Sequence, residues 1–536
     1  MANLLYLLGI ASAVTAVLWV LRRTKYPPGA QRQLKLPTNQ SLISQKLVEA
    51  LPHIVLSHSD KDAFRKSIDS YWAQQEREVR QACIVQPREA SEVASVINIL
   101  KREHGRQRPS TGGCDDVLFA VRGGGQSPVP GGASAKGGVL IDLTLMREVT
   151  VSDDRESVAL GAGTRWVDVL RLLDREGLTA VGGRSSDVGV AGYTLGGGIS
   201  FFTPRFGLAC SNVLAYEVVL ASGNIVTATA QSHSDLWRAL KGGSNNFGVV
   251  TRFTVRCFPS TKIWSGFLYA PNSQSAKAIV AFHDSVKRSD PKIGRADVDP
   301  HAAPPITCFT YVQPVGMQIV TVHLAYTNLS EEPKGWPDYW KTSRFASLWR
   351  LWSTFRPRTV TSAVIEMSST SPPGQRWSFG TTTIKNDLHT IFAARAAHEK
   401  AIGSLRRVKG LIWTIVMQPL LPSWAAKGDT NVLGIHEETD DALVILSFSV
   451  YWQRAGDDRH VYATIRETIE AIEAVATANG KGHRFRYLNY CAQWQRPLEG
   501  YGEENLRFLT KVSRKYDPDG LFQSGCTGGF KLDPRN

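Results

Sequence analysis

The chain has 536 residues, of which 43% are hydrophobic and 21% charged, so it has ample apolar surface for a folded core and its composition excludes a mainly disordered protein. Its 62 Lys and Arg against 48 Asp and Glu give a net charge of +14, but these basic residues are spread along the chain without a zinc-finger or RNA-binding motif, and we expect no nucleic-acid partner. The seven Cys and twelve His show neither a C-x-x-C nor an H-E-x-x-H spacing, which argues against a disulfide framework and predicts no metal site.

The first predicted element is a membrane anchor. Residues 4–21 form an apolar run without a charge, about the minimum length that crosses a hydrocarbon core. No Lys or Arg precedes this run, whereas Arg22, Arg23 and Lys25 follow it, which favours a retained single-pass helix over a cleaved signal peptide. The positive-inside rule favours a cytosolic body over a lumenal one. We therefore expect residues 1–24 to anchor the protein in a membrane, that of the endoplasmic reticulum.

Two N-glycosylation sequons point the other way. They begin at Asn39 and Asn328, and such sequons are used only in the secretory lumen. The side of the membrane on which the body lies stays open at this point.

The elements beyond the anchor alternate in type. Residues 25–81 are predicted to form a tether and a helical lead-in, with an amphipathic helical pattern over residues 41–82, that packs on the body. Short apolar runs then alternate with runs of helical period, which predicts an α+β fold. The predicted strands are residues 83–86, 119–121, 139–141 and 158–160, and the predicted helices are residues 91–103 and 166–176, the second ending at Gly177.

A glycine run, RGGGQS at residues 122–127, directly follows the predicted strand at 119–121. Consecutive backbone N–H groups can converge there without obstruction by side chains, which is typical of an anion nest. A Rossmann fingerprint would require a helix to begin at once, and Pro128 and Pro130 forbid one. A P-loop is excluded as well, because no glycine run ends in Gly-Lys followed by Ser or Thr.

Two further glycine runs follow, at residues 181–198 and 242–248, and the last leads into a predicted strand at 249–253. Their small residues would let a flat ring system lie against the backbone. The order RGGGQS, GGRSSDVGVAGYTLGGG, FGLACSNVLAYEVVLASGNIVTA and KGGSNNFGVVTRF resembles the FAD-binding domain of the vanillyl-alcohol oxidase / p-cresol methylhydroxylase (PCMH) type. It resembles the berberine-bridge-enzyme-like branch of FAD-linked oxidoreductases most closely.

The C-terminal third carries the same resemblance. YLNY at 487–490, KYDP at 515–518 and GGFKL at 528–532 are similar to the tail of fungal members of that branch, and QPL at 418–420 with NVLG at 431–434 is similar to their substrate domain. The resemblance implies an α+β fold with a two-subdomain PCMH-type FAD-binding domain and a substrate domain that contains an antiparallel sheet, beside the N-terminal transmembrane helix. The expected boundaries are 82–261 for the FAD-binding domain, 262–481 for the substrate domain, and 482–536 for a segment that returns to the FAD-binding domain.

The resemblance also implies where FAD is held. The first run would hold the pyrophosphate through backbone donors, residues 185–198 would line the flavin, and Val249 and Val250 would lie near the adenine end. The cofactor-binding residues implied in this way are Arg122, Gly123, Gly124, Gly125, Gln126, Ser127, Gly183, Ser185, Val188, Gly189, Gly192, Gly196, Gly197, Gly198, Val250 and Asn489.

We expect the FAD to be bound non-covalently. Members of the family often attach FAD through a His in R-G-G-G-H-S and a Cys in the second run, and here Gln126 and Ser185 occupy these positions. An amide is not a nucleophile, and a Ser hydroxyl supplies no thiolate at neutral pH.

The function implied by the resemblance is that of an oxidase. Such an enzyme takes a hydride from a C–H bond of a lipophilic natural-product intermediate in secondary-metabolite biosynthesis and reduces O2 to H2O2. Val188 stands at the position that the resemblance assigns to an oxygen gate, although a Val in a strand has packing as its ordinary role. The candidate catalytic residues are Tyr193, Gln418 and Asn489, with Tyr490 beside them, and each also has a structural reading as a wall, orienting or core residue.

Two alternatives stay open. A flavoprotein cyclase would keep FAD for structure while its pocket folds a reactive intermediate. A membrane dehydrogenase would pass its electrons to an acceptor other than O2, which the predicted anchor makes reasonable.

Overall fold

The computed structural model describes residues 38–106, 117–260, 262–293, 298–329, 335–435, 441–526 and 528–532. The predicted anchor at residues 4–21 lies outside these ranges, and within them no helix is long and apolar enough to cross a membrane. Asn39 falls in the first described helix at a position whose side chain is not described, whereas Asn328 is exposed.

The first of three sheets has four strands, with a parallel core. Its order is β1-β2-β4-β3, in which β2, β4 and β3 run parallel and β1 pairs with β2 antiparallel. All four residues of β4 are buried, as expected for a strand that is covered on both faces. The elements are β1 (Val55–Leu56), β2 (Cys83–Val85), β3 (Phe119–Arg122), β4 (Val139–Asp142) and the helices α2 (Thr38–Ala50), α3 (Lys61–Asp69), α4 (Gln74–Glu78) and α5 (Ala90–Arg106).

The predicted strands and helix of this region are confirmed, and one expectation is corrected. The helical lead-in over residues 41–82 is not one continuous helical stretch, because it is divided into α2, α3 and α4 with the short strand β1 between the first two. The lead-in packs on the body as predicted, since Leu47 and Ile43 of α2 join the core of the first two sheets.

The second sheet has six antiparallel strands in the order β5-β6-β10-β8-β9, with β7 paired to β10. Helix α6 ends as the sequence predicts, because Gly177 adopts a left-handed φ of 66° just after it. The elements are β5 (Val149–Val151), β6 (Ser157–Gly161), β7 (Leu178–Ala180), β8 (Val213–Val219), β9 (Ile225–Thr229), β10 (Val249–Pro259), α6 (Trp166–Arg175), α7 (Val190–Leu195), α8 (Thr203–Phe206) and α9 (Ser234–Leu240).

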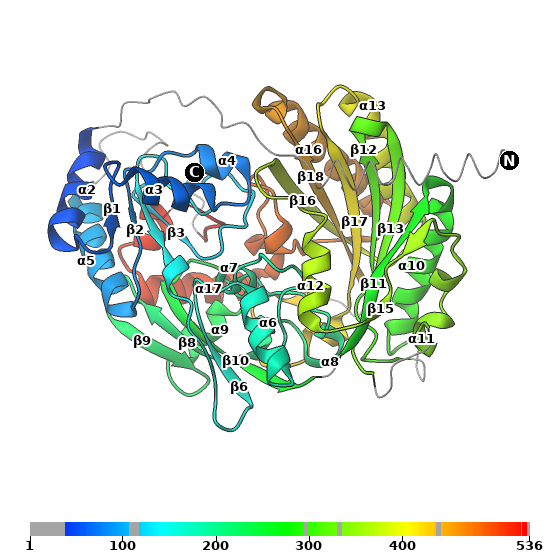
Figure 1. The fold of residues 1–536 in the computed structure, drawn as a ribbon, viewed down its shortest axis with the longest axis horizontal. Helices are drawn as coiled ribbons and strands as arrows, with labels where there is room; N and C mark the ends of the chain where they lie inside the picture. The colour runs from blue at the N-terminus through cyan, green and yellow to red at the C-terminus, as the bar shows by residue number, and fades with distance from the viewer. Residues whose placement is uncertain are drawn as a thin grey trace.

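The third sheet has nine antiparallel strands and occupies the right-hand half of the molecule in Figure 1. Its order is β14-β11-β13-β12-β17-β18-β16-β19, with β15 paired to β11. The strands are β11 (Ile263–Pro271), β12 (Ile306–Val312), β13 (Met317–Tyr326), β14 (Trp352–Ser353), β15 (Arg356–Arg358), β16 (Arg376–Lys385), β17 (Ile412–Leu420), β18 (Leu443–Trp452) and β19 (Gly482–His483).

Helices cover the outer face of this sheet. The long helices α10 (Ser275–Ser289), α13 (Leu388–Leu405) and α16 (Asp458–Ala478) pack on it, while α11 (Asp338–Lys341), α12 (Val360–Ser368) and α14 (Pro422–Ala425) lie in its connections (Figure 1). Side chains alternate along each strand: Trp413, Ile415 and Met417 of β17 enter the core beneath the helices. The side chains between them on β17 therefore face the other half of the molecule, which contains the first two sheets and the three glycine runs.

The last part of the chain returns to the first half, as Figure 1 shows for the red helix α17 (Glu503–Tyr516). Helix α17 packs on α9, and the ring of Phe522 meets the edge of Phe119 of β3 at 6.0 Å. The remaining elements of this segment are the 3-10 helices η8 (Leu488–Tyr490) and η9 (Leu498–Tyr501) and the π-helical turn η10 (Leu521–Gly525). The predicted α+β architecture with antiparallel sheets is thus confirmed.

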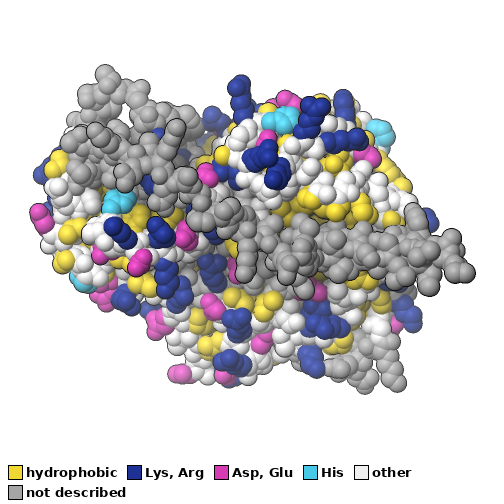
Figure 2. All heavy atoms as spheres, turned by 45° about the horizontal axis from the view of Figure 1, so that its top comes forward, with side chains coloured by type: hydrophobic (Ala, Val, Ile, Leu, Met, Phe, Trp, Pro, Cys, Tyr) yellow, Lys and Arg dark blue, Asp and Glu magenta, His cyan; other side chains and the backbone are white. Residues whose placement is uncertain are grey.

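The positive charge is distributed over the surface. In Figure 2, Lys and Arg side chains are spread over the described part of the face that is shown, with Asp and Glu side chains among them. This distribution is that of a solvated basic surface.

Candidate active site

A cavity of about 930 Å³ lies between the glycine-rich half and the nine-stranded sheet. All three predicted glycine runs contribute to one side of its wall, and the inner face of the sheet forms the other side. The sheet residues alternate as a strand dictates; they include Phe267 and Tyr269 of β11, Ile306, Cys308 and Thr310 of β12, Ile319 and Thr321 of β13, Trp377 and Phe379 of β16, Thr414, Val416 and Gln418 of β17, and Ser447 and Ser449 of β18.

The first two glycine runs touch each other backbone to backbone. A Cβ atom placed on Gly124 would lie 2.5 Å from the Cα of Gly189, and one placed on Gly189 would lie 2.6 Å from the Cα of Gly124. Such contacts leave no room for any side chain. At Gly125 the chain turns with a φ of 65°. The wall therefore presents peptide groups at close range, which suits the phosphates and flat rings of a flavin nucleotide.

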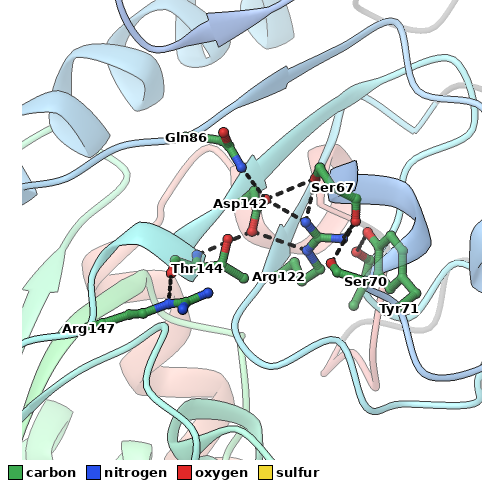
Figure 3. A network of polar contacts seen from close by, with 9 residues as sticks. Ser67, Ser70, Tyr71, Gln86, Arg122, Asp142, Thr144 and Arg147 are labelled. Atoms are coloured by element: carbon green, nitrogen blue, oxygen red, sulfur yellow. Dashed lines mark hydrogen bonds and ion pairs between the residues drawn. The ribbon is translucent and has the colours of Figure 1, made fainter. Parts of the chain in front are cut away.

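Arg122 begins the first run but is not part of the cavity wall. Its guanidinium is buried, pairs with the Asp142 carboxylate at 2.5 Å, donates to the Ser67 carbonyl at 2.8 Å and stacks on the Tyr71 ring (Figure 3). Although burial acts to raise the pKa of Asp142, the charge of Arg122 and hydrogen bonds from Gln86 hold it below its usual value. This network fixes the strand that leads into the run.

Tyr193 supports the second run from behind. Its hydroxyl donates to the Gly182 carbonyl at 3.0 Å, and its ring meets Trp166 edge-on at 5.6 Å. Burial raises the pKa of Tyr193 well above its usual value, so the hydroxyl stays protonated. Although Tyr193 lines the cavity, its proton is engaged with the backbone.

The segment around Asn489 ties the second run to the C-terminal part of the chain. The Asn489 amide donates to the Tyr193 carbonyl at 3.1 Å, and the Tyr487 hydroxyl accepts the backbone N–H groups of Gly198 and Ile199 at 3.1 and 3.2 Å. A Cβ on Gly196 would collide with the Asn489 side chain. This segment positions the run that carries Val188.

The third run is held by the chain end. The Asn245 amide donates to the Gly528 carbonyl and the Asn246 amide to the Phe530 carbonyl, both at 3.0 Å. Gly529 and Phe530 line the cavity together with Asn245.

Most of the predicted cofactor residues lie in the wall. Those that line it are Gly123, Gly124, Gly125, Gln126, Ser127, Gly183, Ser185, Val188, Gly189, Gly192, Val250 and Asn489. Arg122, Gly196, Gly197 and Gly198 are not among the lining residues. The predicted catalytic residues Tyr193, Gln418 and Asn489 all reach the cavity.

The lining residues that sequence reasoning missed include most of the sheet residues, and also Arg184 and Trp72. Arg184 interrupts the second glycine run, and a charge inside a run of small residues was the signal that could have found it. Trp72 stacks on Trp377 of β16 at 4.3 Å, and its backbone N–H donates to the Gly125 carbonyl at 3.0 Å. No local sequence pattern predicts this bridge between the first run and the sheet. On the sheet side, Trp72 contacts residues about 300 positions away in the chain, such as Ser371, whose carbonyl accepts from its indole.

Comparison with known proteins agrees with this geometry. Residues 81–229 match the FAD binding domain family. The chain is 32% identical over 505 residues to the FAD-dependent monooxygenase FUP4 of Fusarium proliferatum, covering 92% of this chain and 93% of that protein. It belongs to the same family of FAD-dependent oxidoreductases as this fungal protein. A second relative in this family, the FAD-dependent monooxygenase drtC of Aspergillus calidoustus, is 32% identical over 89% of this chain and 87% of its own length.

Solved structures share the fold of this family member. 6-Hydroxy-D-nicotine oxidase from Arthrobacter nicotinovorans aligns with a TM-score of 0.67 at 22% identity, covering 90% of this chain and 98% of that one. The BBE-like 1 protein of Physcomitrella patens aligns with a TM-score of 0.66 at 19% identity, covering 91% and 99%. Glucooligosaccharide oxidase from Acremonium strictum, described with a 6-S-cysteinyl, 8α-N1-histidyl FAD, aligns with a TM-score of 0.67 at 17% identity, covering 91% and 99%.

Proposed function

We propose that this FAD-dependent oxidoreductase is an oxidase that binds FAD non-covalently and oxidises a C–H bond of a largely apolar natural-product intermediate. The observation that carries the proposal is the cavity itself, with side-chain-free peptide groups on one wall and a mostly apolar sheet on the other. When bound, FAD accepts a hydride and passes both electrons to O2.

Non-covalent attachment is supported by the nucleophiles that the cavity offers. Gln126 and Ser185 stand in the wall, and no His is among the described residues that line it. Three Cys line it, and burial raises the pKa of each thiol, that of Cys308 to about 12. A protonated thiol is a poor nucleophile.

Tyr490 is the acid–base group that the geometry favours. Its hydroxyl oxygen accepts N–H groups from Arg184 at 3.2 Å and from Gln418 at 3.3 Å. Both contacts use the oxygen and leave the phenolic proton free. Gln418 and Asn489 then act as orienting residues, since an amide neither gains nor loses a proton at neutral pH.

The flavin and its attachment are tested on the purified protein. We expect the flavin absorption bands in the visible range, and we expect acid precipitation to leave the flavin in the supernatant. A yellow pellet would refute non-covalent binding. A protein that is colourless and that cannot be reconstituted with FAD would refute the whole proposal.

The oxidase reaction is tested without a known substrate. The holoprotein is reduced with dithionite under argon and mixed with buffer that contains O2. An oxidase reoxidises within seconds and yields one H2O2 for each flavin. Reoxidation over many minutes would favour a dehydrogenase or a cyclase with a structural flavin.

The predicted anchor is part of this proposal, because a membrane would concentrate an apolar substrate beside the cavity. Fractionation of cells that express the full chain, followed by protease protection and glycosidase treatment, tests it. A soluble body would refute the anchor, and a protected, glycosylated body would reverse the expected cytosolic orientation.

A further inference from the structure

The charges of the cavity wall are few and unbalanced. Among the described residues that line the cavity, Arg184 is the only Lys, Arg or His, and Asp187 is the only carboxylate. Asp187 is exposed, whereas Arg184 is 7% exposed. A buried positive charge therefore faces the cavity without a buried negative charge in its wall.

The hydrogen bonds of Arg184 are incomplete on the same side. Its Nη2 group donates to the side-chain oxygen of Gln418 and to the Tyr490 hydroxyl at 3.2 Å. Its Nη1 group is buried and finds no acceptor within the described part of the chain. A buried, charged donor without an acceptor is costly, and in native proteins it calls for an explanation such as a ligand.

Other buried guanidinium groups of this protein differ from Arg184 in having a carboxylate partner, although the Nε of Arg358 also lacks an acceptor among the described residues. Arg122 pairs with Asp142, Arg358 with Glu366, and Arg376 with Asp458. The fold thus supplies a carboxylate to a buried Arg where the role is structural. The effect of the unneutralised charge reaches His323, whose pKa is lowered to about 3 by burial first and then by the charges of Arg184 and Arg358.

We propose that Arg184 binds an anionic oxygen of the substrate, so that the substrate is an apolar molecule with one acidic oxygen, as in a carboxylate, an enol or a phenol. The charge of Arg184 would pair with that oxygen, and its free Nη1 group would donate a charge-assisted hydrogen bond. Gln418 and Tyr490 hold the guanidinium in place, and the apolar side chains Ile306 and Val416 on the inner face of the sheet receive the rest of the molecule. The inference deepens the proposed oxidase function and rests on it.

Calorimetric titration of the holoprotein with benzoate and with its neutral isostere benzamide tests the inference. Wild type is expected to bind benzoate at least tenfold more tightly than benzamide. Arg184→Gln is expected to lose this preference and keep its affinity for benzamide, whereas Arg184→Lys retains part of the preference. Arg252→Gln, which removes one exposed positive charge paired with Glu148, is the control and should leave both affinities within about twofold.

A second variant keeps the guanidinium and neutralises it. Gln418→Glu places a carboxylate at the position that already accepts from Arg184, and we expect benzoate affinity to fall at least tenfold while the flavin content is unchanged. If Arg184→Gln does not fold, this variant tests whether Arg184 binds the anionic oxygen.

The inference is overturned if wild type does not prefer benzoate, or if Arg184→Gln or Gln418→Glu binds benzoate as wild type does. Benzoate binding by the variants that equals that of wild type is expected if an oxygen of the flavin already accepts the Nη1 hydrogen bond. Failure of the proposed function is separate: it appears as a protein without flavin, on which the same titrations still report whether Arg184 binds an anion.

Discussion

At the scale of single residues, the contact between Gly124 and Gly189 determines the shape of the cavity wall. The sequence predicted both glycine runs, because glycine clusters stand out in any pattern. It could not predict that the two runs touch, since that contact depends on how the first two sheets dock.

The change Gly124→Ala tests this contact. Its Cβ would lie 2.5 Å from a backbone atom of Gly189, so the runs must separate, at a cost of about 1–3 kcal/mol. We expect flavin absorbance per mole of protein to fall at least tenfold. Gly105→Ala is the matched control, because Gly105 lies in helix α5 with nothing within 4 Å of the added methyl group. It should keep full flavin content and gain up to about 1 kcal/mol.

Val188 is the residue at which the proposed oxygen access can be changed. It is half-buried in the cavity wall, and the larger side chain in Val188→Leu would occupy space that O2 needs. We expect dithionite-reduced Val188→Leu to reoxidise at least tenfold more slowly in stopped-flow measurements, and Val188→Ala to react as fast as wild type or faster. Equal rates in all three proteins would remove Val188 from oxygen control.

At the scale of elements, α4 connects the two sides of the cavity. Gln75 donates to the Trp377 carbonyl at 2.5 Å and accepts its backbone N–H at 3.0 Å, which fixes α4 to β16. On the other side, Glu76 is fully buried next to the loop of residues 131–134, and part of that loop lines the cavity. The helical pattern of this segment was predictable, but its role as a bridge was not, because both partners are remote in sequence.

Glu76 should make stability depend on pH. Burial raises its pKa from 4.5 to about 7, although Ser134 and the backbone N–H groups of residues 131–133 act in the opposite direction. Below about pH 4.5 the carboxyl is neutral in both states. As pH rises to about 7 the unfolded chain loses this proton first, so the folded state loses up to about 3 kcal/mol.

The change Glu76→Gln should remove this loss. We expect the thermal midpoint of the variant to exceed that of wild type increasingly between pH 4.5 and pH 7, and the gap to stay constant above pH 7. Glu470→Gln, an exposed substitution on α16, controls for net charge. Parallel curves for Glu76→Gln and wild type would show that Glu76 does not bind its proton more tightly in the folded protein.

At the scale of the whole molecule, the cavity lies between halves that the chain joins several times. A ligand that fills it contacts all three glycine runs and the nine-stranded sheet at once, so it stabilises the assembled molecule. At a free FAD concentration of 100 times Kd, the gain is about 2.7 kcal/mol. We expect added FAD to raise the unfolding temperature of the apoprotein by a few degrees, and Gly124→Ala to abolish the rise at the same concentration. A wild-type midpoint that does not change would contradict a cavity shaped for FAD.

The α+β architecture could be predicted because strand and helix periods are local and because the order of the glycine runs is specific. The inner face of the sheet could have been predicted in part, since Ile306, Cys308 and Thr310 alternate with core residues along β12. The pairing of Arg184 with Gln418 could not, because 234 residues separate them. The same holds for the inward turn of Arg122, which only its buried partner Asp142 explains.

The tail that closes the third glycine run has a consequence for biogenesis. Gly529 and Phe530 form part of the cavity wall, and a ribosome polymerises them after the other described residues that line it. The dinucleotide can therefore meet its complete binding surface only once translation has passed these codons. Loading of the cofactor is then expected to be a late event in maturation.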